Sequence, residues 1–501
     1  MNRLAFGLAA ALVVSAGCDN LAPKTGPVAS PAPAAWPAGP AYAAPAAPAG
    51  PAAADLGWRD FLADQRLRDV VDLALANNRD LRVAALNIER ARALYNVRRA
   101  DLFPSIDAGA AGTAQRTPGG VGVSPDAVTS HVYNLEVGFA SYELDLFGRV
   151  RNLKDQALQQ YFATEDARRA AQISLVAEAS SRYLALGADR ELLRLAKETL
   201  ASRQASFELI KRRVDVGIAS DLTLRQAETT VDTARGYVAR FTTQVAQDVN
   251  ALALVVGAPV PAELLPGEDL FRTPATKDVS AGLPSEVLER RPDIMQAERT
   301  LRAADANIGV ARAAFFPRIA LTANAGVASA DLSNLFKGGT GAWTFAPQAT
   351  LPIFGAGRLK GNLAAAKAER GIALAQYERA IQGAFREVAD ALALRGTVDE
   401  RIAAQEALVA ATGASQRISE QRFRTGISSY LDVLDAQRTL YDAQKALISV
   451  RLAKADNNVT LYKVLGGGWT ANTPAPKDAA PVGGAAEKRS DAAAMQAASP
   501  R

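Results

Sequence analysis

Two stretches of the chain alternate with a period of two between apolar residues and small or polar residues. The apolar positions of the first stretch are Tyr133, Leu135, Val137 and Phe139, and those of the second are Ile319, Leu321 and Ala323. Because successive side chains of a strand point to opposite faces, this pattern predicts strands with one apolar and one polar face. Further strands are expected after Pro104 and from Trp343, which gives four strands in two pairs.

Strands of this kind suit two environments. A strand that lines a wet lumen inside lipid shows the alternation, and so does a soluble antiparallel sheet with one buried face. Four strands cannot close a barrel, and lipid excludes open sheet edges. A membrane location would therefore need several copies of the chain, and three copies would supply twelve strands.

The remainder of the chain is predicted to be helical. Residues 126–258 and 353–473 contain no proline, and within them residues 157–213 and 364–424 are rich in helix-forming Ala, Leu, Glu, Arg and Gln. A helix of about 60 residues is roughly 90 Å long. We expect such helices to pair along their length, in a coiled coil or a helical barrel, because a compact globule cannot contain them.

The body of the chain looks duplicated. Asp80 lies 213 positions before Asp293, and Pro104 lies 213 positions before Pro317. Two further pairs of similar segments follow in the same order, residues 145–149 with 353–358 and residues 213–220 with 422–429. Four anchors at a nearly constant offset predict that each half is one copy of a single plan. The long helical hairpin of each copy is expected to turn at a glycine, Gly217 or Gly426.

The N-terminus predicts an exported, lipid-anchored protein. Residues 1–17 read as a signal peptide, with a positive start and an apolar stretch too short to span a membrane. Small residues then precede Cys18, as in the bacterial lipoprotein cleavage box, where the thiol becomes acylated. Ser15 departs from the leucine usual in that box, and Asp19 resembles an inner-membrane retention signal of some bacteria. An ordinary signal peptide with an incidental cysteine is the alternative.

We expect six segments along the chain. They are a signal peptide (1–17), a lipid-anchored Ala- and Pro-rich tether (18–55), a first repeat (56–260), a linker (261–282), a second repeat (283–468) and a disordered tail (469–501). The strands are expected near 104–116 and 131–145 in the first repeat and near 317–329 and 341–353 in the second.

Charge and composition argue against several classes of protein. The net charge of +5 is small, and acidic and basic residues alternate, so no nucleic-acid groove is expected. Cys18 is the only cysteine, which excludes intrachain disulfides. His131 is the only histidine and predicts no metal site. No nucleophile and base are suitably arranged, and Gly338-Gly339 lacks the lysine of a phosphate loop. We therefore expect no enzyme and no cofactor.

Several motifs in a fixed order resemble a known family. They are the Phe-Pro-x-Ile strand starts at 103–106 and 316–319, the runs 143–149 and 351–355, and the paired Arg-x-x-x-Gly-Ile turns. Over residues 61–467 the chain resembles the TolC/OprM outer-membrane factors, in particular the lipoprotein branch that serves resistance-nodulation-division efflux pumps. The resemblance implies a mixed α/β membrane protein. Three chains would form a twelve-stranded outer-membrane β-barrel continuous with a long periplasmic α-helical barrel.

The resemblance also implies partners and a function. The homotrimer would be a passive export duct for drugs or other small molecules, in the outer membrane of a Gram-negative bacterium. A periplasmic adaptor and an inner-membrane pump of the RND type would complete the conduit. The same fold serving type I protein secretion is one alternative. A lipid-anchored periplasmic coiled-coil scaffold is another, and it would have no lipid-facing strands.

The helix after Gly426 carries a candidate gate. Asp435 lies four residues after Leu431 and three after Asp432, so the three share one helix face. In three chains they would form rings, and carboxylate rings favour cations. The family that this chain resembles has its aperture acids at the positions matching Asp432 and Asp435. Ser429 followed by Asp432 also predicts a capping box, so a purely structural role for Asp432 stays open.

The two turns between the long helices are candidate docking tips. The resemblance places adaptor contacts at Gly217, Ile218, Ala219, Ser220, Gly426, Ile427, Ser428 and Ser429. Glycine at such a turn also serves the backbone, because positive φ is accessible to it at little cost. We expect both roles.

Overall fold

The computed structural model of the chain describes residues 20–24, 26, 31–42, 53–121, 125–267, 270–271, 274–279 and 290–467. Cys18, the signal segment and the predicted tail lie outside the described residues. The chain divides into two compact units. The first comprises Met1–Pro31, Ala85–Ala167 and Asp293–Ile381, and the second comprises Ala32–Ala84, Arg168–Pro292 and Gln382–Arg501.

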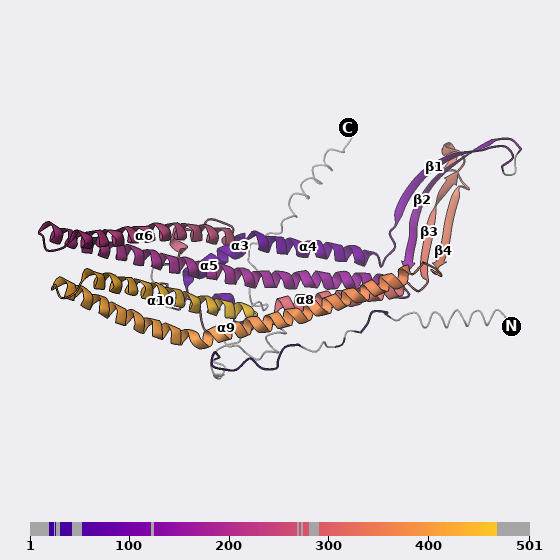
Figure 1. Ribbon diagram of the computed structural model, residues 1–501. Helices are drawn as coiled ribbons and strands as arrows, with labels where there is room; N and C mark the ends of the chain where they lie inside the picture. Colours follow the sequence, from indigo (N-terminus) through magenta and orange to yellow (C-terminus); the bar gives the residue numbers. More distant parts are fainter. Residues whose placement is uncertain are drawn as a thin grey trace, which may run out of the picture. The chain divides into compact units, whose positions relative to one another are not determined.

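A four-stranded antiparallel sheet lies in the first unit (Figure 1). Its strands are β1 (Asp107–Thr117), β2 (Val128–Leu144), β3 (Arg318–Ser329) and β4 (Gly341–Thr350), paired in that order. β1 and β4 are therefore the edges, and within the described part of the chain neither has a partner on its outer side. Each edge presents a row of backbone groups ready to pair with another strand.

The strand register gathers apolar side chains on one face of the sheet. Val137 lies opposite Ala325, which lies opposite Trp343. Residues opposite each other share a face, so the alternation predicted in residues 133–139 is present as one apolar face. The polar face carries Asn134, Glu136, Asn324, Thr344 and Gln348. Trp343 is 78% exposed, so the apolar face is uncovered in the single chain.

A β-bulge interrupts β2 near its end. Phe139 pairs with Ala323, but the next pairing is Tyr142 with Leu321, so one extra residue is inserted in β2. Ser141 takes up the irregularity with a φ of 57°, and its N–H donates to the Thr322 side chain at 3.1 Å. The bulge returns Tyr142 to the apolar face, as bulges re-aim side chains elsewhere.

The helical part of the first unit contains α8 (Pro292–Ala313) and portions of α4 (Arg79–Ala100), α5 (Arg149–Asp215) and α9 (Arg358–Arg424). Buried ion pairs connect these helices. Asp305 of α8 pairs with Arg370 of α9 at 2.6 Å, and Asp166 of α5 pairs with Arg299 of α8 at 3.8 Å. Both aspartates have side chains only 4% exposed, and charges buried to this degree require such partners.

The second unit contains α2 (Trp58–Phe61), α3 (Gln65–Asn77), α6 (Asp221–Val256), α10 (Tyr430–Val464) and the remaining lengths of α5 and α9. Its core includes a ring pair, Phe61 on Tyr462, with centroids 4.1 Å apart. The Tyr462 hydroxyl donates to the Leu56 carbonyl at 2.8 Å, and burial raises the pKa of Tyr462. None of the described helices is long and apolar enough to cross a membrane.

Helix lengths show the internal duplication. α5 and α9 each have 67 residues, and α6 and α10 have 36 and 35. The helices α9 and α10 each begin 209 positions after their counterparts α5 and α6. A 67-residue helix is about 100 Å long. Within the second unit, Gln405 of α9 donates to the Ala443 carbonyl of α10 at 2.9 Å, which shows that these helices pair as a hairpin.

Candidate functional site

The first hairpin turn ends α5 with a left-handed glycine. Gly217 has a φ of 75°, and its N–H donates to the Val214 carbonyl at 2.9 Å. The Ile218 N–H donates to the Arg213 carbonyl, also at 2.9 Å. These two bonds form a Schellman motif, in which glycine avoids the penalty of a side chain at positive φ. Ile218 is left 73% exposed at the tip.

The second turn repeats this geometry. Gly426 has a φ of 78° and donates to the Phe423 carbonyl at 3.1 Å, while Ile427 donates to the Arg422 carbonyl at 2.9 Å. Ile427 is 66% exposed. The neighbouring Ala219 and Ser428 are only half-exposed. The most accessible apolar side chains of the predicted docking residues are therefore the two isoleucines.

An arginine connects the two turns within one chain. Arg213 donates to the Arg424 carbonyl at 2.9 Å and to the Phe423 carbonyl at 3.4 Å. Its guanidinium also lies 5.0 Å from the centre of the Phe423 ring. Below it, a shared apolar cluster of Ile210, Ala227, Tyr430 and Val433 joins the two hairpins. The sequence placed Arg213 only in the turn motif and gave no sign of this bridge.

The start of α10 has a buried side and an exposed stripe. Tyr430 and Val433 are buried, whereas Leu431 is 61% exposed. Asp435 is 62% exposed and pairs with Arg438 at 2.5 Å. Leu431, Asp435 and Arg438 follow the i, i+4, i+7 spacing of a single helix face. The structure therefore puts Leu431 and Asp435 on one accessible stripe, as the sequence predicted, and adds a basic residue to it.

Asp432 forms the capping box that its spacing predicts. The Ser429 N–H donates to the Asp432 carboxylate at 3.1 Å, and the Ser429 side chain accepts from the N–H of residue 432. In the first copy the corresponding pair is Ser220 with Thr223, whose N–H donates to the Ser220 hydroxyl at 3.3 Å. At the position equivalent to Asp432 the first hairpin therefore has Thr223, whose backbone N–H completes the cap.

The same offset of 209 positions places Gln226 where the second copy has Asp435. Both acids of the candidate gate therefore have uncharged counterparts in a hairpin of the same design. The two hairpins therefore turn with the same geometry although only the second has acids at these two positions.

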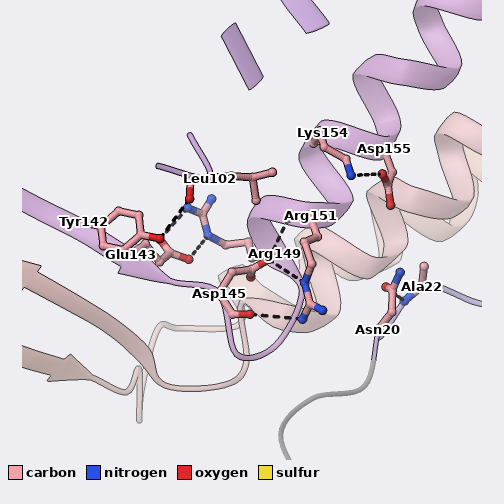
Figure 2. Close-up of polar contacts among 10 residues, drawn as sticks. All are labelled: Asn20, Ala22, Leu102, Tyr142, Glu143, Asp145, Arg149, Arg151, Lys154 and Asp155. Atoms are coloured by element: carbon pink, nitrogen blue, oxygen red, sulfur yellow. Dashed lines mark hydrogen bonds and ion pairs between the residues drawn. The ribbon is translucent and has the colours of Figure 1, made fainter. Parts of the chain in front are cut away.

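A polar network marks the junction between β2 and α5 (Figure 2). Arg149 donates to both oxygens of Glu143, at 2.7 and 2.6 Å, and Arg318 approaches the same carboxylate at 2.6 Å. The Glu143 side chain is only 10% exposed. The hydrogen bond to Glu143 raises the pKa of Arg149, which keeps the guanidinium charged. Glu143 therefore joins the end of β2 to the start of α5 and to β3.

Asp145 begins the helix at this junction. Its carboxylate accepts from the Arg151 backbone N–H at 2.8 Å and from the Arg151 side chain at 3.2 Å (Figure 2). Gly148 turns the chain into the helix with a φ of 75°. The motif at 143–149 is thus a structural joint. It shows no arrangement of groups for catalysis.

Metal binding finds no support in the described residues, which contain no group of three or more His, Cys, Asp or Glu side chains able to hold an ion. His131 lies on β2 opposite Ala114 and is exposed.

Comparison with known proteins gives a consistent result. The sequence model of a family described as "Outer membrane efflux protein" matches residues 70–258 and again residues 283–467. The chain is 46% identical to the antibiotic efflux pump outer membrane protein ArpC of Pseudomonas putida, over 94% of this chain and 97% of that protein. It is 42% identical to the outer membrane protein OprJ of Pseudomonas aeruginosa, over 94% and 97% of the two chains. The crystal structure of the open MtrE outer membrane channel of Neisseria gonorrhoeae superimposes with a TM-score of 0.81 at 37% identity, covering 91% of this chain and all of that one.

Proposed function

Since this chain belongs to the outer membrane efflux protein family and is the outer-membrane channel of a tripartite efflux pump, we propose that three copies form one passive duct for drugs or other small molecules. The open sheet edges are the observation that carries this proposal. Lipid excludes unpaired strand edges, so β4 of one copy must pair with β1 of the next. Three four-stranded sheets then close a barrel of twelve strands.

The two faces of the sheet suit this arrangement. The face with Val137 and Trp343 would meet lipid, and the face with Glu136 and Asn324 would line the water-filled lumen. A duct of this kind needs no catalytic group, and we propose that the protein is not an enzyme. An inner-membrane pump of the RND type would supply the energy, through a periplasmic adaptor that contacts the helical tips.

The exposed stripe of α10 is our proposed gate. In a trimer, Leu431, Asp432 and Asp435 would each form a ring at the periplasmic end of the tunnel. The uncharged counterparts in the first copy support this role, because the same hairpin turn forms there without acids at these two positions. Rings of carboxylates attract cations and repel anions, which predicts a cation-selective channel.

Planar-bilayer conductance of the purified trimer tests the gate. Replacing Asp432 and Asp435 together by Ala removes the acids, and we expect a larger single-channel conductance. The variant Asp432→Thr/Asp435→Gln copies the first hairpin and keeps a cap, so it isolates the effect of charge. We expect its cation selectivity, measured as the reversal potential in a salt gradient, to fall toward zero.

Asp221→Asn supplies a matched control, because Asp221 is an exposed acid in the first turn of the equivalent helix, α6. Its selectivity should stay as in the unaltered protein. Unchanged conductance in the double Ala variant, together with unchanged selectivity in the Thr/Gln variant, would remove Asp432 and Asp435 from the gate.

The anchor and the docking tips complete the proposal. We propose that Cys18 carries the acyl chains and that the lipid enters the periplasmic leaflet of the outer membrane. The tips formed by 217–220 and 426–429 would meet the adaptor, chiefly through Ile218 and Ile427, which are the accessible apolar groups there. Exposed apolar side chains at the end of a helical hairpin favour a partner that also presents an apolar surface.

A further inference from the structure

The first described residues of the chain, 20–22, lie against the helices of the first unit. Arg312 of α8 donates to the Leu21 carbonyl at 2.9 Å. The Ala22 N–H donates to the Asn20 side-chain oxygen at 3.0 Å, which folds the segment into an Asx turn (Figure 2). The Arg312 bond joins the segment to α8, and the Asx turn sets the local backbone conformation.

Glycine at position 309 gives this segment room, and Gly148 lies beside it. A Cβ atom at Gly309 of α8 would lie 3.0 Å from the Ala22 backbone nitrogen and 2.5 Å from the Asn152 amide nitrogen. A Cβ atom at Gly148, just before α5, would lie 3.7 Å from the Asn20 Cα. Glycine allows a close approach of one backbone to another. The segment therefore rests on a surface that a side chain at position 309 would occupy.

Asn152 of α5 lies beneath the segment and is only 1% exposed. Neither polar atom of its amide has a hydrogen-bond partner among the described residues. The residue lines a cavity of about 670 Å³ whose lining also includes Asn20, Ala22 and Pro23. The Asn152 amide is thus enclosed beside the segment and closed to solvent.

We propose that this groove, formed by Gly148, Asn152, Gly309 and Arg312, is a receptor site for the chain's own segment 20–22, and that it fixes the point at which the chain enters the membrane. Residue 18 lies two residues before Asn20, so its Cα is within about 7 Å of the Asn20 Cα in any conformation. Gly148 follows the end of β2 by only four residues. The groove consequently holds residues 20–22 close to the foot of the sheet.

The sequence predicted a lipid-anchored Ala- and Pro-rich tether for residues 18–55. A tether of that length would allow the lipid many positions, whereas with residues 20–22 docked only residue 19 separates residue 18 from the bound segment. The proposed point of membrane entry rests on the proposed acylation of Cys18, whereas the docking of residues 20–22 does not. Each of these two proposals can therefore be contradicted without the other.

A spin label at position 24 tests the docking. Lys24 is exposed, and a nitroxide on Lys24→Cys would report the motion of the segment in the purified trimer. We expect an immobilised spectrum in the otherwise unaltered protein and a mobile one in Asn20→Ala/Arg312→Gln. Arg235→Gln, which alters an exposed arginine of α6 paired with Asp232, should leave the spectrum unchanged. An immobilised label in the double variant would overturn the proposal.

A second pair of variants tests the glycine surface. Gly309→Val should mobilise the label, because its Cβ would lie 2.5 Å from the Asn152 amide beneath the segment and 3.0 Å from the Ala22 nitrogen. Gly371→Val places the same side chain in α9, where a Cβ meets nothing within 4 Å, and should have no effect. Equal spectra for the two valine variants would contradict the proposed groove.

Removing the lipid shows whether the groove or the membrane anchor immobilises the segment. Cys18→Ser, exported behind the signal peptide of a protein that is not a lipoprotein, lacks the acyl chains. We expect the label at position 24 to stay immobilised, and a mobile label would show that the lipid alone holds the segment. Bilayer conductance of the same trimers reports the proposed channel independently, and we expect it to be unchanged in every variant of the groove.

Discussion

Replacing Glu143 by Gln tests whether the junction between β2 and α5 stabilises the fold. Glu143 is 10% exposed and receives three close contacts from two arginines. Removing one partner of a fully buried ion pair costs about 3–5 kcal/mol. Arg149 is 34% exposed and Arg318 is 57% exposed, so water partly solvates both once the carboxylate is gone. We therefore expect a loss of about 2–3 kcal/mol, which includes the lost charge-assisted bonds.

The two arginines should differ in their contributions. Arg149 makes a bidentate contact from a partly buried position, so Arg149→Gln should cost about 1–2 kcal/mol. Arg318 is more than half exposed, and Arg318→Gln should cost less than about 1 kcal/mol. The order of stability loss is thus Glu143, then Arg149, then Arg318.

Denaturant unfolding of the detergent-solubilised protein, followed by far-UV circular dichroism, measures these losses. Glu228→Gln is the control, because its exposed pair with Arg225 on α6 should contribute little. A loss in Glu143→Gln no larger than that in Glu228→Gln would show that the junction does not stabilise the fold. An equal loss in Arg318→Gln and Arg149→Gln would show that burial does not set the contributions of the two arginines.

Two further predictions concern pH and docking. Burial and the neighbouring Asp248 raise the pKa of Asp189 to about 7. In the unfolded chain the same carboxyl loses its proton near pH 4. Protonated Asp189 therefore stabilises the fold fully below about pH 4, and this contribution is lost as the pH rises to 7. Asp189→Asn should therefore unfold at a higher temperature than the unaltered protein at pH 8 and at a similar one at pH 4; an equal gain at both would exclude proton linkage. At the tips, Ile218→Glu/Ile427→Glu should abolish adaptor cross-linking and efflux while bilayer conductance persists, and Val83→Glu, an exposed apolar residue of α4, should leave all three unchanged. Intact cross-linking in the double Glu variant would argue against docking at these isoleucines.

Local patterns in the sequence predicted much of the sheet and of the hairpin turns. Period-two alternation at Tyr133 and its neighbours depends only on successive residues, and β2 contains it. The Ser429 and Asp432 cap was also readable, because its partners are three residues apart. The run of helix-forming residues 157–213 did not locate the start of the first long helix. The helix begins at Arg149, since Asp145 caps it from outside the Ala-rich run.

Features that depend on distant residues were not predictable from the pattern. Ser141 adopts a positive φ although it is not glycine, so the local sequence did not predict the bulge. The contact of Arg213 with Arg424 joins residues 211 positions apart. Docking of residues 20–22 depends on Gly148, Gly309 and Arg312, which meet only in the folded unit. Long-range contacts of this kind leave no periodic signal in one sequence.

The equal design of the two hairpins has a consequence for symmetry. In the proposed trimer, six turns of nearly identical backbone geometry would ring the periplasmic end of the duct. An adaptor that recognises the turn itself would meet six almost equivalent sites. A permeating ion would meet acids on only three of the six hairpins, because Asp432 and Asp435 have the uncharged Thr223 and Gln226 as their counterparts. Duplication followed by divergence at two positions would thus give the ring of helices nearly sixfold symmetry in its backbone and threefold symmetry in its charge.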